Sequence, residues 1–156
     1  MNPNPHLGPG IPVPPPFLYV AALLTGVVLN RAWPLLPLPG SWGYIVGPIL
    51  IVVSVLIMPP VLRRFRRAGT PFDVRKAASA LITDGPYRFS RNPTYMSLTL
   101  LYLGLGAILN NGWILVLAVP VLLIMDLWVV RGEERHLEAK FGDDYLRYKA
   151  TVRRWL

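Results

Sequence analysis

The sequence predicts an all-α membrane protein with about four transmembrane helices. Apolar and aromatic residues make up 53% of the 156 residues and charged residues only 15%, whereas a soluble domain carries about a quarter charged residues. The apolar residues fall into four stretches. The first two are roughly 20 residues long, enough for ~30 Å of hydrocarbon, and the third, at about 17 residues or ~26 Å, is at the short end for spanning. The basic residues behind the net charge of +8 flank these stretches. This distribution favours contact with membrane lipids over binding of nucleic acid.

The composition also limits the possible chemistry. The chain has no cysteine, so disulfides, thiolate catalysis and cysteine-based metal sites are excluded. The only histidines are His6 and His136, and we therefore expect no metal centre.

The first part of the chain divides into a lead-in and two spans. Residues 1–16 are rich in proline and are predicted to be irregular, with binding to a partner as the alternative. Residues 17–62 hold the first two transmembrane helices, predicted at 17–36 and 43–62. Pro59-Pro60 is expected to kink or end the second helix near the membrane surface.

Residues 63–156 form the second part, which begins with a basic loop. Arg63-Arg64-Phe65-Arg66-Arg67 is predicted to fix the topology, to bind anionic lipid headgroups, or to do both. A connection follows, in which residues 77–82 are expected to form a short helix or an extended strip.

Residues 93–130 are predicted to form a transmembrane hairpin, with spans at 93–109 and 113–130. Asn110-Asn111-Gly112 joins the two spans in a tight turn. Asp126 is the only acidic residue within an apolar span. An intramembrane carboxylate suggests function, but Asp126 lies close to the basic tail, and pairing with an arginine is the alternative.

Residues 131–156 form a charged tail. Phe141-Gly142 is expected to break its first helix, and Asp143 to cap a second one. Tyr145, Tyr148 and Trp155 then fall on one face, which is predicted to lie on the membrane surface or, alternatively, to cover a site.

Charge predicts the topology. The loop from Arg63 to Arg91 holds eight basic residues and the tail holds seven, whereas the opposite loops hold only Arg31. The positive-inside rule therefore places both termini, the basic loop and the tail in the cytoplasm.

The polar and aromatic segment 83–95 then meets the tail at the cytoplasmic mouth of the hairpin. No nucleophile with an adjacent base and no phosphate-binding glycine loop is present. The residues suit a polar, partly cationic cofactor beside an amphiphile.

A resemblance extends this interpretation. The segments Gly85–Tyr95 (GPYRFSRNPTY), Glu133–Tyr148 (EERHLEAKFGDDYLRY) and Val152–Leu156 (VRRWL) flank a helical hairpin. In this order they resemble the isoprenylcysteine carboxyl methyltransferase and phospholipid methyltransferase family. The match covers about the last 90 residues. It implies an integral membrane enzyme that uses S-adenosylmethionine and methylates a lipophilic acceptor, such as a prenylcysteine-like carboxylate, a lipid amine or a thiol. Its small size suits a prokaryotic inner-membrane protein.

The resemblance also implies the residues of the site. The expected cofactor contacts are Ala80, Leu81, Ile82, Tyr87, Asn92, Pro93, Thr94, Tyr95, Glu133 and Glu134. The expected catalytic residues are Arg91, Asn92 and Tyr95, and the expected substrate contacts are Arg131, Tyr148 and Arg153.

The chain departs from the family at two positions. Many members have histidine at the position of Asn92, and an amide cannot carry a proton. The eukaryotic prenylcysteine enzymes have a substrate-linked arginine at the position of Val129.

Two other functions are alternatives to the methyltransferase. A membrane sterol or steroid reductase that binds NADPH has a similar Asn-Pro-x-Tyr element, and a non-enzymatic membrane adaptor would use the proline-rich start and the basic tail.

Overall fold

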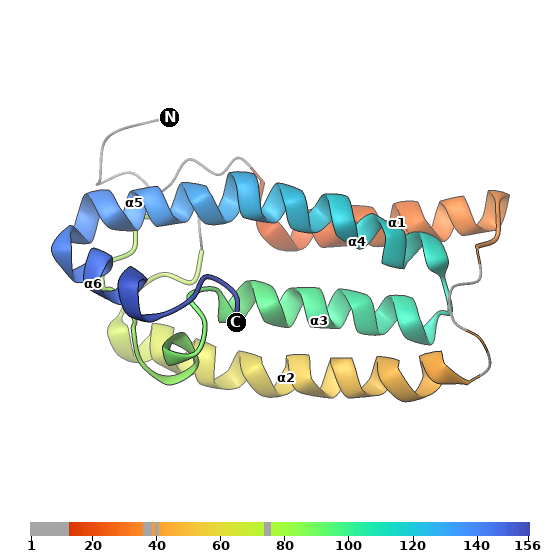
Figure 1. The fold of residues 1–156 in the computed structure, drawn as a ribbon, viewed down its shortest axis with the longest axis horizontal. Helices are drawn as coiled ribbons and strands as arrows, with labels where there is room; N and C mark the ends of the chain where they lie inside the picture. The colour runs from red at the N-terminus through yellow and green to blue at the C-terminus, as the bar shows by residue number, and fades with distance from the viewer. Residues whose placement is uncertain (1–12, 36–38, 40, 74–75) are drawn as a thin grey trace.

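The described part of the chain is helical. The computed structural model describes residues 13–35, 39, 41–73 and 76–156, and these contain no strand. The elements are α1 (Pro15–Ala32), α2 (Trp42–Ala68), the 3₁₀ turn η1 (Gly85–Arg88), α3 (Pro93–Ile108), α4 (Gly112–Ile124), the π-helical segment η2 (Met125–Val130), α5 (Arg131–Phe141) and α6 (Asp143–Thr151). Helices α4, η2 and α5 follow one another as a single long rod (Figure 1).

The helices form two pairs, with α1 against α4 and α2 against α3 (Figure 1). The second pair is close because glycines face each other. A Cβ added to Gly47 would lie 2.8 Å from the Gly104 carbonyl oxygen, and a Cβ on Gly104 would lie 2.9 Å from that of Gly47. Ser54 and Ser97 add hydrogen bonds, since each hydroxyl donates to the other residue's carbonyl, at 2.7 and 3.0 Å. Small residues and interhelical hydrogen bonds are how helices associate in lipid.

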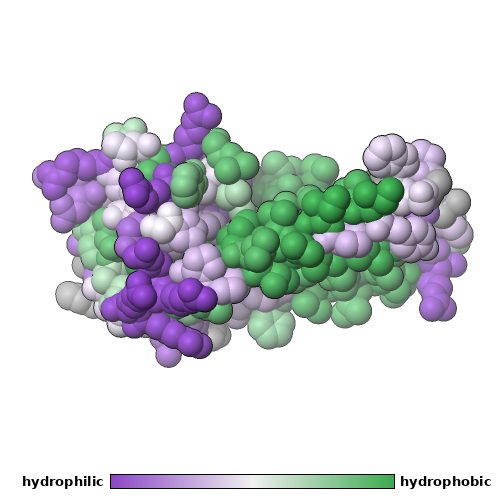
Figure 2. All heavy atoms as spheres, turned by 90° about the horizontal axis from the view of Figure 1, so that it is seen from below, coloured by the Kyte–Doolittle hydropathy of each residue, from purple (hydrophilic) through white to green (hydrophobic). Residues whose placement is uncertain are grey.

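The helices are apolar enough to cross a membrane. Three continuous helical stretches have the necessary length and composition, namely Pro15–Ala32, Trp42–Ala68 and Gly112–Phe141, and the apolar helix Pro93–Ile108 is shorter. Hydrophobic side chains form a band along the helices, and hydrophilic ones gather at the end that holds α5 and α6 (Figure 2). The predicted all-α membrane class, with its four apolar helices, is confirmed.

Two predicted helix ends differ from the structure. Pro59-Pro60 does not end α2, which continues through the arginine block to Ala68, so these arginines are helical. A proline removes its own backbone hydrogen bond and crowds the preceding turn, but neighbouring helices can support the backbone around it. Helix α1 also differs from its predicted span. It begins at Pro15, within the stretch predicted to be irregular, and it ends at Ala32, before the predicted end. Prolines suit a first helical turn because its N–H groups have no helical partner. Residues 1–12 and 36–38 lie outside the described residues.

The tail differs in one detail. The N-cap position of α6 is occupied by Gly142, with φ of +51°, and not by Asp143 as predicted. Asp143 is instead the first residue of the helix, and no side chain makes a capping hydrogen bond. The positive φ explains why a glycine stands there. Residues 77–82 contain no helix, so the alternative of a short helix is wrong for this segment.

Candidate functional site

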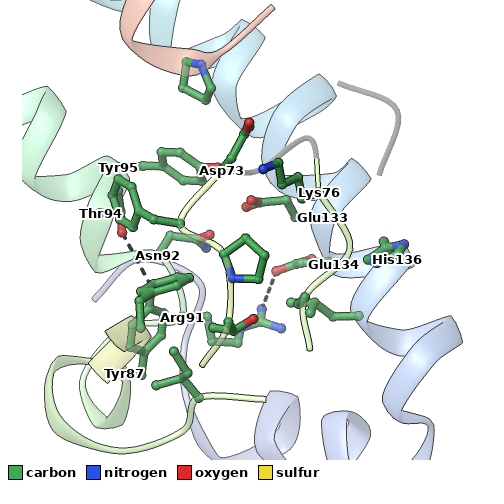
Figure 3. A pocket seen from close by; sticks show the side chains of 18 of the residues that line it. Asp73, Lys76, Tyr87, Arg91, Asn92, Thr94, Tyr95, Glu133, Glu134 and His136 are labelled. Atoms are coloured by element: carbon green, nitrogen blue, oxygen red, sulfur yellow. Dashed lines mark hydrogen bonds and ion pairs between the residues drawn. The ribbon is translucent and has the colours of Figure 1, made fainter. Parts of the chain in front are cut away.

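A cavity of about 460 Å³ opens where α5, the loop between α2 and α3, and the start of α1 meet (Figure 3). Its volume lies within the range of about 300–1,000 Å³ typical of small-molecule sites. Its polar and aromatic walls include Asp73, Lys76, Tyr87, Arg91, Asn92, Thr94, Tyr95, Glu133, Glu134, His136, Tyr145 and Tyr148. Its apolar walls include Pro14, Phe17, Met58, Phe65, Phe72, Leu81, Ile82, Leu98 and Leu137.

Local hydrogen bonds hold the loop that forms one wall. Gly69, with φ of +60°, turns the chain out of α2. The Thr70 hydroxyl accepts a hydrogen bond from the Ser79 backbone at 2.8 Å, and the Ser79 hydroxyl donates to the Gly69 carbonyl at 3.0 Å. Arg64 of α2 pairs with Asp84 further along the loop. These contacts bring the strip Ala80–Ile82 against the cavity.

All the predicted cofactor contacts except Pro93 line this one cavity. Pro93 is buried in the first turn of α3. The residues come from the loop, from α3 and from α5, and the fold therefore brings together three segments that are far apart in the sequence.

Glu133 and Glu134 are adjacent but have different partners. Glu134 is buried and accepts ion pairs from Arg91 at 3.1 Å and Arg154 at 2.7 Å. Glu133 forms no ion pair with any described residue, and Lys76, which also lines the cavity, is not within ion-pair distance of it. Glu133 lies beyond the apolar part of its helix, which ends at Val130. Burial raises the pKa of the Glu133 carboxyl to about 7, an interaction with the Tyr95 hydroxyl partly offsets this, and the Glu134 charge adds to it.

Three polar atoms in the cavity wall are buried and make no well-formed hydrogen bond to a described residue. They are Nε and NH1 of Arg91, whose NH2 pairs with Glu134, and the hydroxyl oxygen of Tyr95, which is close enough to Glu133 to influence the pKa of its carboxyl. Leaving such a group unsatisfied costs about 1–3 kcal/mol. A ligand with complementary groups would offset this cost. Because the Arg91 atoms are buried, a ligand reaches them only after a side-chain shift at the cavity wall.

Asn92 has a structural partner. Its side-chain nitrogen donates to the Arg154 carbonyl at 3.0 Å, and only 7% of the residue is exposed. Its amide therefore fastens the segment 152–156 to the start of α3, although the residue also lines the cavity.

Of the three predicted substrate contacts, only Tyr148 lies at the cavity. Tyr148 lines the cavity and donates its hydroxyl to the Tyr87 carbonyl at 2.7 Å. Arg131 and Arg153 do not line the cavity. Arg131 instead pairs with Asp126 at 3.5 Å. Burial raises the pKa of both Tyr87 and Tyr148 well above the ordinary 10. Both hydroxyls therefore stay protonated at neutral pH, which suits aromatic contact rather than base catalysis.

The aromatic face of the tail packs against protein. Tyr145 and Tyr148 are 1% and 8% exposed and line the cavity, and Trp155 packs against the hydrophobic core. The prediction that this face lies on the membrane surface is therefore wrong, and the alternative of a site cover is closer. An aromatic stripe suits both surfaces, so its spacing could not distinguish them.

Several cavity residues were not among the predicted site residues. His136 and Leu137 follow Glu133 at spacings of three and four, so helical periodicity alone could have placed them on its face. Phe72, Asp73 and Lys76 reach the cavity only through the irregular loop, and no local pattern in the sequence signals this. Among the described residues, no group of three His, Cys, Asp or Glu side chains could hold a metal ion.

A polar and aromatic cavity at one end of apolar helices defines an integral membrane protein with a small-molecule site. The chain matches the phospholipid methyltransferase family over residues 42–144, more than half of its length, and belongs to that family. It is thus a membrane methyltransferase. A protein of Haemophilus influenzae described only as uncharacterized is 40% identical over 62 residues, which are 40% of this chain and 98% of that protein. No solved structure matches the chain.

Proposed function

We propose that the protein transfers a methyl group from S-adenosylmethionine to a lipophilic acceptor at the cytoplasmic face of the membrane. The observation that carries this proposal is Glu133, a carboxylate in a tyrosine-lined cavity without a cationic partner among the described residues. A buried carboxylate costs free energy unless it is paired. A cationic ligand would supply the missing charge.

The cavity suits the different parts of this cofactor. Glu133 is placed to meet its positive charges, and the faces of Tyr87 and Tyr148 offer cation–π attraction to a sulfonium worth about 0.5–2 kcal/mol. Arg91, with two unsatisfied nitrogens, offers a complement to the carboxylate of its amino-acid part. The strip Ala80–Ile82 supplies an apolar wall for the flat base.

Methyl transfer of this kind needs little general acid or base catalysis from the protein. S-adenosylmethionine supplies the methyl group, whose bond to sulfur breaks as its bond to the acceptor forms, and the electron pair of the broken bond returns to sulfur. The protein's residues must hold the two reactants in line, and such positioning can supply about 7–11 kcal/mol of the barrier. A carboxylate acceptor loses no proton. For an amine or thiol acceptor, Glu133 is a group in the cavity that can take the proton, since its pKa is about 7.

The acceptor is proposed to be lipophilic because the cavity continues onto apolar helices. Phe17 of α1, Met58 of α2 and Leu98 of α3 line it on the side of the membrane spans. The cytoplasmic orientation rests on charge, because the cavity lies between the basic loop and the basic tail, which together hold all the basic residues except Arg31.

Calorimetric titration of S-adenosylmethionine into detergent-solubilised protein tests the cofactor. Saturable binding that Glu133→Gln weakens is expected. The matched control is Glu138→Gln, which removes a carboxylate from the same helix that pairs with Lys149 and does not line the cavity. Binding of NADPH, with no response to S-adenosylmethionine, would instead indicate a reductase. Binding of neither would indicate a non-enzymatic membrane protein.

A further inference from the structure

The segment 152–156 lies against the start of α3 and is fastened there by hydrogen bonds to its backbone carbonyls. The Arg91 N–H donates to the Arg153 carbonyl at 3.0 Å. The Arg154 carbonyl accepts from the Ser90 hydroxyl at 3.1 Å and from the Asn92 side chain at 3.0 Å. Three consecutive residues before α3, two of which line the cavity, thus depend on this segment for their hydrogen bonds.

The side chain of Arg154 then joins this segment to the α4–α5 rod. Its Nε and NH2 atoms donate to the two oxygens of Glu134 at 3.1 and 2.7 Å. Its NH1 atom donates to both oxygens of Asp126 at 3.2 and 3.3 Å. The Trp155 indole adds a hydrogen bond to Asp126 at 3.2 Å. The intramembrane carboxylate Asp126 therefore has an arginine partner, and it lies in the π-helical segment η2.

This arrangement limits how Arg91 can bind Glu134. Arg91 NH2 lies 3.1 Å from Glu134 Oε1, and Arg154 Nε donates to the same oxygen. The other oxygen accepts a hydrogen bond from Arg154 NH2 at 2.7 Å. Arg91 consequently keeps two nitrogens without a partner among the described residues. An arginine facing a free carboxylate normally binds it through both oxygens, so without Arg154 the Arg91 side chain would turn fully onto Glu134.

We infer that Arg154 is a positioning residue that holds Glu134 so that Arg91 stays available for the anionic group of a ligand. The inference rests on the proposed function, in which that anionic group is the carboxylate of the cofactor. Arg154 itself does not line the cavity. It acts through Glu134, and its effect is on which ligands the site prefers.

The test compares two ligands that differ only in the carboxylate, namely S-adenosylhomocysteine and its decarboxylated analogue. Wild-type protein in detergent is expected to bind the first about 10-fold more tightly or better, because an ionic hydrogen bond depends on the carboxylate. In Arg154→Gln this preference should fall to within about twofold. Arg147→Gln is the matched control and should retain the preference. It removes an arginine of α6 whose ion pair, among the described residues, is with Asp144 on the surface.

The outcomes distinguish failure of the positioning role of Arg154 from failure of the proposed function. Equal weakening of both ligands by Arg154→Gln, or an unchanged preference, would overturn the positioning role, since a merely structural residue acts on both ligands alike. Arg154→Lys serves if the first variant does not fold, because lysine keeps the charge but lacks the fork, and it too should lose the preference. Wild-type protein that binds neither ligand would overturn the proposed function, and the inference with it.

Discussion

The unpaired carboxylate of Glu133 makes cofactor binding depend on pH. Its pKa is raised to about 7 in the protein without ligand. A cationic ligand favours the ionised form, lowers this pKa and releases a proton on binding. Affinity therefore rises with pH. If only the ionised form binds, protonation weakens binding about 11-fold at pH 6 and about 1.1-fold at pH 8, a change of about tenfold.

Calorimetric titrations of S-adenosylhomocysteine at pH 6, 7 and 8, in buffers of different ionisation enthalpy, would measure both the affinity and the protons released. About half a proton should be released at pH 7. The ligand's own amino group also titrates, at higher pH, and burial lowers the pKa of His136 in the cavity wall from 6.5. Glu133→Gln keeps both of these groups and is therefore the control. Equal pH dependence in this variant and the wild type would refute the role given to Glu133.

Three further predictions concern packing and the site. Ser54→Ala and Ser97→Ala should show a coupling of about 0.6–1.7 kcal/mol in a double-mutant cycle of unfolding in detergent, and independent effects would show that the pair is not coupled. Gly104→Ala should destabilise the α2–α3 pair by about 1–3 kcal/mol, because its Cβ would meet backbone 2.9 Å away, and an unchanged melting temperature would contradict this packing. Asn92→Ala should weaken cofactor binding by leaving the Arg154 carbonyl with the Ser90 hydroxyl as its remaining side-chain donor, whereas normal binding would separate Asn92 from the site.

The helices could be predicted because their signals are local. Four apolar stretches and the turn Asn110-Asn111-Gly112 are enough to place the hairpin, and α3 begins at Pro93 as expected. Helix ends were harder to predict, because α2 continues past Pro59-Pro60 and a proline signals a break only where nothing else supports the backbone.

The site could be predicted only in part from the amino-acid sequence. Most of the residues that the resemblance implied line the cavity, including Tyr87 and Glu133, but they form less than half of its lining. It did not distinguish Glu133 from Glu134, because their difference depends on arginines from two distant segments, Arg91 and Arg154. Which of two adjacent carboxylates is paired depends on tertiary geometry, and no spacing in the sequence encodes it.

The most direct test of the proposed activity is transfer of a labelled methyl group. Membranes containing the wild-type protein, Glu133→Gln or Glu138→Gln would be incubated with S-adenosylmethionine labelled in its methyl group, and the lipid extract and the thiol and prenylcysteine fractions counted. The proposal predicts label in one of these fractions with the wild type and Glu138→Gln, and a loss of most of it with Glu133→Gln. Equal label with Glu133→Gln, or none in any fraction with the wild type, would contradict it.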